Sequence, residues 1–247
     1  MSMIGIWKWG AVGGALLLAA AGVAAGPLPL IANYTFDGGA ADSSGNKLDG
    51  KVTGNVKIVS GGKSGGALEV GSGGGVEVRH ALFDRMTANF TVSLWVKPEG
   101  FADNRWEDGV LFAKGGNAGV QLSMMRSGAL FLHGSWGGGW YHSPWSGAGW
   151  IAPGKWNHVA LAFEKGGTSR LYVNGECVGK FATPFAIWPV GDPLKVGFGR
   201  WKGLLDEVAF YAVTLDEKQV GNWRRAAGPR PVPRFWRICR KMIIRYG

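Results

Sequence analysis

Hydrophobic and polar residues alternate along most of this chain, in short segments that glycine and other turn residues separate. Over residues 90–97, Val92, Leu94 and Val96 fall on one side of the chain, and the residues between them fall on the other. A period of two residues is typical of a β-strand, in which successive side chains point to opposite faces of the sheet. The same pattern predicts thirteen strands, over residues 31–37, 55–58, 67–70, 76–78, 90–97, 110–113, 120–124, 129–133, 156–164, 168–173, 176–181, 194–198 and 204–210.

Turn residues between these segments predict antiparallel hairpins. Asn174 and Gly175 separate two strand segments, and both middle positions of a type I′ turn need the positive φ that these residue types tolerate. Glycine-containing turns at 126–128 and 165–167 predict two more hairpins. Many short strands followed by one late helix favour an all-β fold, an antiparallel two-sheet jelly-roll sandwich with one short C-terminal helix.

The last predicted strand carries an acidic residue among apolar ones. Strict alternation over 204–210 places Asp206 on the same face as Val208 and the other large apolar side chains. An ionised carboxylate on such a face needs a hydrogen-bonded or metal partner. Thr214, followed three residues later by Glu217, forms a capping-box pattern that predicts the start of the helix.

Seven stretches resemble, in the expected order, the laminin G-like, concanavalin A-like family of jelly-roll domains. They read YTFDGGAADSSGNKLDG, GGALEV, FTVSLWVKP, GKWNHVALAF, RLYVNGECVG, LKVGFG and GLLDEVAFYAVTLDEKQV, and they cover residues 32 to 222. The resemblance implies two stacked antiparallel sheets of about six or seven strands each, with one concave face. It also implies a non-catalytic module that binds glycans or proteins, in some members with a calcium ion at the sheet edge.

The basic charge of the chain is concentrated at its ends. The net charge is +10, but the chain has eight basic residues and no acidic one from Asn222 onward, and Lys8 adds one more near the start. The rest of the chain therefore carries a net charge of only +1. A nearly neutral body lacks the basic surface of nucleic-acid-binding proteins, so we expect no nucleic-acid partner.

The N-terminus has the features of a secretory signal peptide. Lys8 precedes an uncharged run of small and apolar residues, and Val23 and Ala25 occupy the −3 and −1 positions of a cleavage site. We therefore expect secretion or display at the cell surface; a retained N-terminal membrane anchor is the alternative. The domain division that follows is a signal peptide at 1–25, a jelly-roll domain at 26–227 and a basic tail at 228–247.

The basic tail leaves two questions open. It mixes basic and large apolar residues, which favours either contact with an anionic membrane surface or a solvated, poorly ordered terminus. Cys177 and Cys239 are the two cysteines of the chain, and export permits a disulfide between them. Two free or buried thiols are the alternative.

An Asp- and Asn-rich loop predicts a structural calcium site. Asp37, Asp42 and Asn46 lie in or beside the loop at 37–49, and the resemblance implies that this loop meets the last strand at Asp206. Calcium takes about six to eight oxygen ligands, which carboxylates, amides and backbone carbonyls of short loops supply. The alternative is that these side chains only hold turns together and accept backbone N–H donors.

An aromatic segment predicts a ligand surface. Between Trp136 and Trp150 the chain reads WGGGWYHSPWSGAGW, in which small residues separate five aromatic ones. Glycine spacers leave ring faces uncovered, and such rings are common in recognition surfaces. The predicted ligand-binding residues are Trp136, Trp140, Tyr141 and Trp145. The alternative is that these rings fold inward as a small separate core.

Catalysis is not expected from this sequence. None of the seventeen Asp and Glu residues stands two positions from another, so no strand presents a same-face carboxylate pair for glycoside hydrolysis. We predict a monomeric, exported, non-catalytic module that recognises carbohydrate or an extracellular protein. The first alternative is a structural or adhesion component attached by its basic tail, and a divergent glycoside hydrolase is the second.

Overall fold

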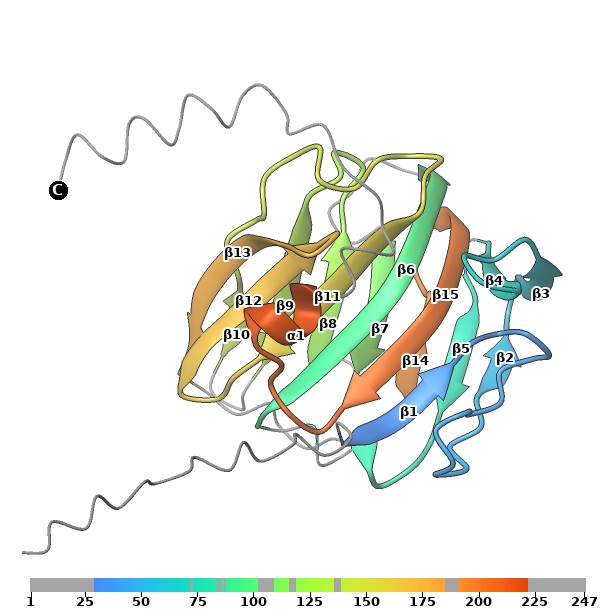
Figure 1. Ribbon diagram of the computed structural model, residues 1–247, viewed down its shortest axis with the longest axis horizontal. Helices are drawn as coiled ribbons and strands as arrows, with labels where there is room; N and C mark the ends of the chain where they lie inside the picture. Colours follow the sequence, from blue (N-terminus) through green and yellow to red (C-terminus); the bar gives the residue numbers. More distant parts are fainter. Residues whose placement is uncertain are drawn as a thin grey trace, which may run out of the picture.

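The computed structural model of the chain describes residues 29–71, 73–83, 86, 88–101, 109–115, 119–135, 139–184 and 191–221. In these residues the chain forms two antiparallel β-sheets that stack face to face, with one short helix on the outer side (Figure 1). The predicted two-sheet sandwich with a short helix near the end of the domain is confirmed. The predicted signal peptide at 1–25 and basic tail at 228–247 lie outside the described residues.

The larger sheet has eight strands and the smaller one has seven. In spatial order the larger sheet contains β13 (Glu176–Thr183), β12 (Gly167–Val173), β11 (Asn157–Phe163), β6 (Phe90–Phe101), β15 (Trp201–Tyr211), β4 (Gly66–Val70) and β3 (Val56–Ser60), while β1 (Leu30–Tyr34) pairs with β15. The smaller sheet contains β10 (Trp140–His142), β9 (Leu130–Ser135), β8 (Val120–Met124), β7 (Gly109–Lys114), β14 (Leu194–Val196), β5 (Gly75–Val78) and β2 (Lys51–Thr53). The helix is α1 (Glu217–Gly221).

All thirteen predicted strands are present, although several begin or end at other residues than expected. The hairpin at Asn174 and Gly175 is also confirmed, since their φ angles are 50° and 76°. Two strands were not predicted, β2 and β10. Each has only three residues, which is too few to show an alternation, and β10 lies in the aromatic segment, where no strand was predicted.

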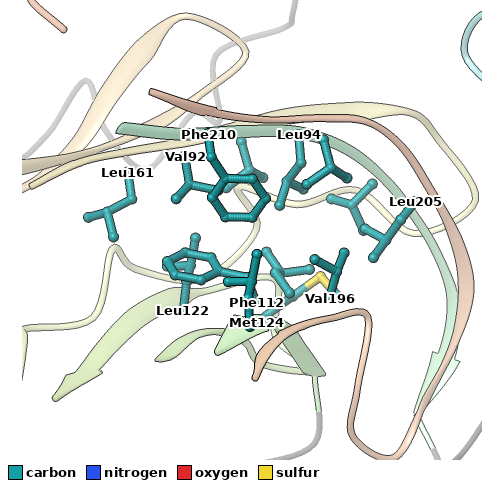
Figure 2. Packing of buried hydrophobic residues seen from close by; sticks show 14 of the residues in the cluster. Val92, Leu94, Phe112, Leu122, Met124, Leu161, Val196, Leu205 and Phe210 are labelled. Atoms are coloured by element: carbon teal, nitrogen blue, oxygen red, sulfur yellow. The ribbon is translucent and has the colours of Figure 1, made fainter. Parts of the chain in front are cut away.

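The inner faces of the two sheets form one hydrophobic core (Figure 2). Val92, Leu94 and Phe210 come from the larger sheet, and Phe112 and Leu122 come from the smaller one. The rings of Phe112 and Phe210 meet edge to face across the sandwich, with centroids 6.0 Å apart. This contact fixes the distance between the sheets at the centre of the core.

A β-bulge in β15 places Asp206 on the outer face of the larger sheet, so the predicted position on the core face is wrong. The pairing of β15 with β6 shifts register between Asp206 and Ala209, and Glu207 has a φ of 50°. The extra residue restarts the alternation, so Leu205 and Val208 both reach the core. Asp206 instead stands opposite Trp95, whose ring is outside the main core cluster.

The helix is capped by other residues than the sequence predicted. The backbone N–H of Gln219 donates to Asp216 Oδ1 at 2.7 Å, and the backbone N–H of Asp216 donates to Gln219 Oε1 at 2.9 Å. This reciprocal pair is the capping box of α1. Thr214 does not cap the helix, because its hydroxyl donates to the carbonyl of Phe163 in β11. The predicted Thr214–Glu217 cap is therefore wrong, and α1 begins at Glu217.

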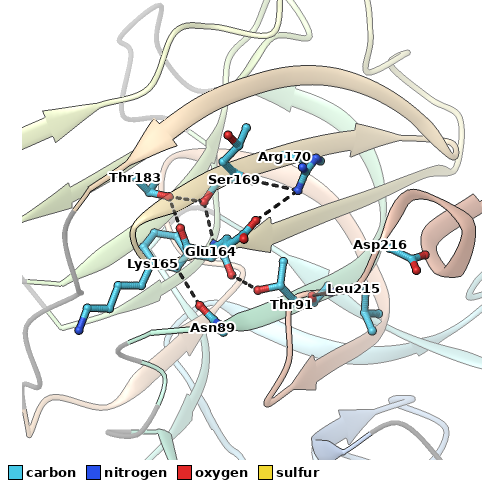
Figure 3. A network of polar contacts seen from close by, with 12 residues as sticks. Asn89, Thr91, Glu164, Lys165, Ser169, Arg170, Thr183, Leu215 and Asp216 are labelled. Atoms are coloured by element: carbon cyan, nitrogen blue, oxygen red, sulfur yellow. Dashed lines mark hydrogen bonds and ion pairs between the residues drawn. The ribbon is translucent and has the colours of Figure 1, made fainter. Parts of the chain in front are cut away.

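A polar network ties the end of the domain to the larger sheet (Figure 3). Thr91 Oγ accepts the backbone N–H of Leu215 at 2.9 Å and donates to the carbonyl of Val213 at 2.8 Å. Farther along the sheet, Ser169 Oγ accepts the backbone N–H of Glu164 at 3.0 Å. The two bonds of Thr91 hold the segment before α1 against β6, on the outer face of the sheet.

Candidate functional site

The outer face of the smaller sheet carries a continuous row of mostly polar side chains. Neighbouring residues in β7, β8 and β9, such as Phe112, Leu122 and Leu132, point into the core, so by alternation the residues next to them point outward. The strand register places one outward residue of each strand opposite the next. In spatial order the row is His142, His133, Gln121, Ala113, Lys195, Glu77 and Lys51.

The row has a hydrogen-bonding end and a charged end. At one end the rings of His133 and His142 stack, with centroids 4.5 Å apart and planes 18° apart. At the other end Lys195 Nζ lies 3.9 Å from Glu77 Oε1 and 5.2 Å from the centre of the Phe198 ring. The small side chain of Ala113 lies between the two ends.

Trp145 lies beside the hydrogen-bonding end of this row. Its side chain is 60% exposed, the largest exposed apolar side chain in the described residues. Its ring centre lies 6.5 Å from that of Phe131, an outward residue of β9 that is itself only 2% exposed. An exposed indole supported by a buried ring, on the same sheet face as two imidazoles and an amide, is suited to stacking against a sugar ring while polar groups bind its hydroxyls.

Two serines fix the position of Trp145. The backbone N–H of Ser143 donates to the carbonyl of Leu132, and Ser143 Oγ accepts the N–H of Leu132, each at 2.9 Å. Ser146 makes the same pair of bonds with Leu130, also at 2.9 Å. Both serines are buried. The segment between them is held to the edge of β9 at both ends, so Trp145 is presented on a fixed support.

The four predicted aromatic ligand residues are placed differently from one another. Trp136 lies outside the described residues, and only the backbone of Trp140, paired with Ser135, is described. Tyr141 is half-buried, and its hydroxyl donates to the carbonyl of Ala182 in β13 at 3.1 Å. It therefore joins the edges of the two sheets. Trp145 is exposed over the smaller sheet.

Sequence reasoning missed Gln121, His133 and His142 as candidate ligand residues. The alternation in β8 and β9 would have placed Gln121 and His133 on the outer face. His142 joins them only through the pairing of β10 with β9, and β10 is too short to be recognised from its pattern. The signal that could have been noticed is the Ser-Pro-Trp-Ser sequence, in which two serines flank Trp145.

Asp42, one of the predicted calcium ligands, instead organises a turn. Its two carboxylate oxygens accept hydrogen bonds from the backbone N–H groups of Asn33, Ser44 and Leu48 and from the hydroxyl of Ser44, at 2.8 to 3.1 Å. Partial burial works against ionisation of Asp42, but these bonds outweigh it and hold the pKa below its usual value. Asn46 uses its Nδ2 to donate to two backbone carbonyls of β1.

Asp37 and Asp206 both accept hydrogen bonds from the backbone of residues 64–66, at the start of β4. Asp206 accepts the N–H of Ser64 at 2.9 Å and that of Glu207 at 2.7 Å, while Asp37 Oδ1 accepts the N–H of Gly66 at 2.8 Å. Burial raises the pKa of Asp206 to about 6, although the bonds from Ser64 and Glu207 act in the opposite direction. Burial, followed by the charge of Asp37, also raises the pKa of Glu207. The carboxylates are therefore close enough to influence one another.

The fit of these residues to calcium is uneven. Asp42 does not fit, because N–H and O–H donors already face both of its oxygens, and Asn46 presents its amide nitrogen to the backbone. N–H donors also face both oxygens of Asp206, from Ser64 and Glu207. Asp37 fits better, since only its Oδ1 accepts a hydrogen bond within the described residues. No group of three or more His, Cys, Asp and Glu residues in the described part of the chain is placed to hold a metal ion.

A second buried polar group lies on the outer face of the larger sheet. Ser93 Oγ and His158 Nε2 are 2.9 Å apart, and the His158 ring meets Trp95 with centroids 5.3 Å apart. Burial lowers the pKa of His158 to about 3, so its ring is neutral at physiological pH. Lys63 covers Trp95, with Nζ 4.4 Å from the ring centre. A buried imidazole of such low basicity is suited to packing rather than to activating a hydroxyl.

The described residues define a two-sheet antiparallel β-sandwich. Residues 70–221 match the family model described as the concanavalin A-like lectin/glucanases superfamily, which spans more than half of the chain. The chain therefore belongs to this superfamily, as its sequence motifs predicted. No curated protein matches the sequence closely enough to be counted as a relative.

Solved structures of binding domains share this fold. Domain 4 of AbnA, a GH43 extracellular arabinanase of Geobacillus stearothermophilus in complex with arabinotriose, is 24% identical with a TM-score of 0.65, and the match covers 80% of this chain and 98% of that one. The binding domain of Paraclostridial Mosquitocidal Protein 1 is 18% identical, with a TM-score of 0.69 and coverage of 79% and 52%. The binding domain of botulinum neurotoxin DC, in complex with SialylT, is 15% identical, with a TM-score of 0.66 and coverage of 81% and 52%. This chain thus matches about half of each toxin binding domain.

The described residues contain no helix with the length and apolar character needed to cross a membrane.

Proposed function

We propose that this protein is an exported, non-catalytic module that binds carbohydrate on the outer face of its smaller sheet, with Trp145 as the main contact. The observation that carries the proposal is the 60% exposure of a tryptophan whose backbone is tied to β9 on both sides. Placing a rigid aromatic ring in advance lowers the entropic cost of binding. Gln121, His133 and His142 supply hydrogen-bonding groups beside it.

Two of the related structures support carbohydrate as the ligand class. One is described in complex with arabinotriose and another in complex with SialylT. A second structure of the botulinum neurotoxin DC binding domain, 15% identical, is described in complex with rat synaptotagmin II, so an extracellular protein is the second candidate. The row on the smaller sheet contains one carboxylate, Glu77, and it faces Lys195. A lone carboxylate paired with a lysine does not make the two-carboxylate site of a glycosidase, which supports a non-catalytic role.

A glycan array probed with the full chain tests this function. Trp145→Ala is expected to weaken binding to the best glycan at least about tenfold, the change that corresponds to roughly 1.4 kcal/mol. Val52→Ala is the matched control, because Val52 is the other exposed large apolar residue in the described part of the chain and lies on β2 at the far edge of the same sheet. Unchanged binding by Trp145→Ala, or a glycan product released over time, would exclude the proposed role.

Calcium remains part of the proposal, with Asp37 as the carboxylate that keeps an oxygen available for it, rather than at Asp42, Asn46 or Asp206. Ca²⁺ would supply a cation that neutralises neighbouring carboxylates and holds the loop before β4. Added Ca²⁺ is expected to raise the melting temperature, and a chelator is expected to reverse the rise. Asp37→Asn should lose this response, while Asp49→Asn, a change at another turn carboxylate, should keep it. A melting temperature that ignores both calcium and chelator would show that no ion is bound.

The remaining parts of the proposal concern the ends of the chain. We expect a cleaved signal peptide, secretion or surface display, and a monomer in solution. The basic segment after α1 favours one alternative, an adhesion component that attaches to anionic surfaces, because that segment carries eight basic residues and no acidic one. Two binding assays distinguish these functions. Binding to glycans should depend on Trp145, whereas binding to anionic vesicles should depend on the charge of the basic segment and should weaken as the salt concentration rises.

A further inference from the structure

A second aromatic ring lies on the outer face of the smaller sheet, towards the end opposite Trp145. Val76 of β5 points into the core, so its neighbour Gly75 faces outward. A Cβ atom at Gly75 would stand 2.4 Å from Cδ2 of Phe198, so the Phe198 ring rests directly on the backbone of β5. The ring is half-buried and is not part of the core cluster. Phe198 therefore presents an apolar surface on the same face as Trp145.

Hydrogen bonds fix the backbone around Phe198. Trp201 Nε1 donates to the carbonyl of Phe198 at 3.0 Å, and the Trp201 side chain is fully buried. The next carbonyl, that of Gly199, accepts the backbone N–H of Gly73 at 3.1 Å. Phe198, like Trp145, is thus held in position before a ligand arrives, which lowers the entropic cost of binding.

Beside this ring, two lysines flank one carboxylate. The strand register places Glu77 of β5 between Lys195 of β14 and Lys51 of β2. Lys195 Nζ lies 3.9 Å from Glu77 Oε1 and 5.2 Å from the centre of the Phe198 ring, and its side chain is 43% exposed. An ammonium group has three donors, so a single carboxylate leaves Lys195 with donors for a second anion. The charged end of the face is therefore suited to an anionic group on a ligand.

The spacing of the two aromatic rings indicates the length of the ligand. Trp145 contacts Phe131 of β9, and Phe198 follows β14. Because β8 and β7 lie between β9 and β14, these strands are three spacings apart, or roughly 14 Å at about 4.8 Å each. One sugar ring is too short to touch both aromatic rings, whereas a chain of several sugars can. Ala113 of β7 lies between them, and its small side chain leaves space for such a chain.

We propose that the ligand of this face is an acidic oligosaccharide, with one sugar stacked on Trp145, another on Phe198, and a carboxylate of the second bound by Lys195. The inference rests on the proposed function, because it adds a substrate class to the same glycan surface. A uronic acid has both features needed at the Phe198 end. Its C–H groups form an apolar face for the aromatic ring, and its carboxylate makes a charge-assisted hydrogen bond with the ammonium group.

An array of oligosaccharides probed with the full chain tests the substrate class. It carries neutral glycans together with fragments of polygalacturonate, polymannuronate and glucuronoxylan, each beside its methyl ester, which has the same length and linkage but no charge. At least one acid is expected to bind about tenfold more tightly than its ester, and this preference should weaken as the salt concentration rises. Esters bound as tightly as their acids, or binding confined to neutral glycans, would overturn the inference and leave the proposed function intact. Binding to no glycan at all would remove both.

Replacing Lys195 by Gln assigns the contact with the carboxylate. The preference for the acid over its ester should fall to about twofold or less, because the ammonium group that distinguishes them is gone. Lys57→Gln is the matched control, since Lys57 also faces a carboxylate across two strands, Glu69 at 3.4 Å, but on the other sheet. Both lysines are exposed, so both variants should keep the melting temperature of the wild type. A preference that survives Lys195→Gln, or that falls equally in the two variants, would contradict the assignment.

Replacing Phe198 by Ala tests the second aromatic contact. Affinity for the best hexasaccharide is expected to fall about tenfold, while affinity for the disaccharide of the same series should not change, because a disaccharide does not reach from Trp145 to Phe198. The disaccharide also serves as the folding control, since a misfolded variant would lose both ligands. Hexasaccharide binding that is unaffected by Phe198→Ala would show that the ligand does not extend to this ring.

Discussion

At the scale of single residues, the most informative arrangement is the pair of serines around Trp145. Each serine donates its backbone N–H to a carbonyl of β9 and accepts a backbone N–H of β9 at its hydroxyl. The two serines therefore bond to the edge of β9 as a paired strand would. Tryptophan is rarely left exposed without a function, because its large apolar surface is costly in water. The rigid support makes this exposure usable for binding.

Replacing Ser143 by Ala tests that support. The change leaves the buried N–H of Leu132 without its acceptor, which costs about 1–3 kcal/mol. We expect a lower free energy of unfolding in urea titration and weaker glycan binding than in the wild type, because one of the two attachments of the Trp145 segment keeps only its backbone hydrogen bond. Ser60→Ala, at an exposed position at the end of β3, should change neither quantity. Unaltered binding by Ser143→Ala would mean that the support does not matter for recognition.

His158 predicts how stability changes in acid. Burial lowers its pKa from 6.5 to about 3, so between these values the unfolded chain binds a proton that the folded chain does not. The free energy of unfolding should therefore fall as pH decreases from 6.5 towards 3, with a slope from this group of up to about 1.4 kcal/mol per pH unit. Urea titrations of the wild type and His158→Gln at several pH values in this range measure that slope. If both proteins lose stability in parallel, His158 is not the responsible group.

At the scale of elements, the bulge in β15 decides which side chains face the core. Glu207 adopts a left-handed backbone, with a φ of 50°, and this residue restarts the alternation. Without it, Leu205 and Val208 could not both reach the core. The bulge also puts Asp206 beside the loop that precedes β4, where it accepts the N–H of Ser64, so one irregular residue serves both packing and the attachment of this loop.

Two substitutions at Glu207 test the bulge. A left-handed backbone is strained for a branched residue, so Glu207→Val is expected to lower the free energy of unfolding by about 1–2 kcal/mol. Glycine accepts the same φ freely, at an entropic cost of about 0.5–1 kcal/mol, so Glu207→Gly should be close to neutral. Thermal or urea unfolding gives both values. A glycine variant as unstable as the valine variant would assign the loss to the Glu207 side chain instead of its backbone.

The elements also show what the sequence could and could not predict. The strands and the turn at Asn174 and Gly175 depend on local alternation and turn chemistry, so the fold class could be predicted from the sequence. The bulge could not, because nothing in the sequence marks Glu207 as left-handed. The helix cap had two local solutions, and the hydrogen bond from Thr214 to Phe163 removed one of them. His142 could not be placed because its position depends on pairing between strands.

At the scale of the whole molecule, the sandwich is joined at its edges as well as through its core. At one side the turn that Asp42 organises connects β1 of the larger sheet to β2 of the smaller one. At the other side Tyr141 of the smaller sheet reaches β13, the edge strand of the larger one, through its hydroxyl and its contact with Phe181. The glycan surface lies next to this second junction, so Tyr141 has both a structural and a ligand-binding interpretation.

Replacing Tyr141 by Phe separates the two interpretations. The change removes only the hydroxyl that joins Tyr141 to the carbonyl of Ala182, while the contact with Phe181 remains. If Tyr141 is structural, the free energy of unfolding should fall by about 1 kcal/mol, the usual net value of one hydrogen bond, and glycan affinity should stay within about twofold of the wild type. A large loss of affinity with unchanged stability would instead place Tyr141 among the ligand residues, as its sequence context predicted. Because β10 carries both Tyr141 and His142, His142→Ala provides the comparison: we expect it to weaken binding and to leave the junction intact.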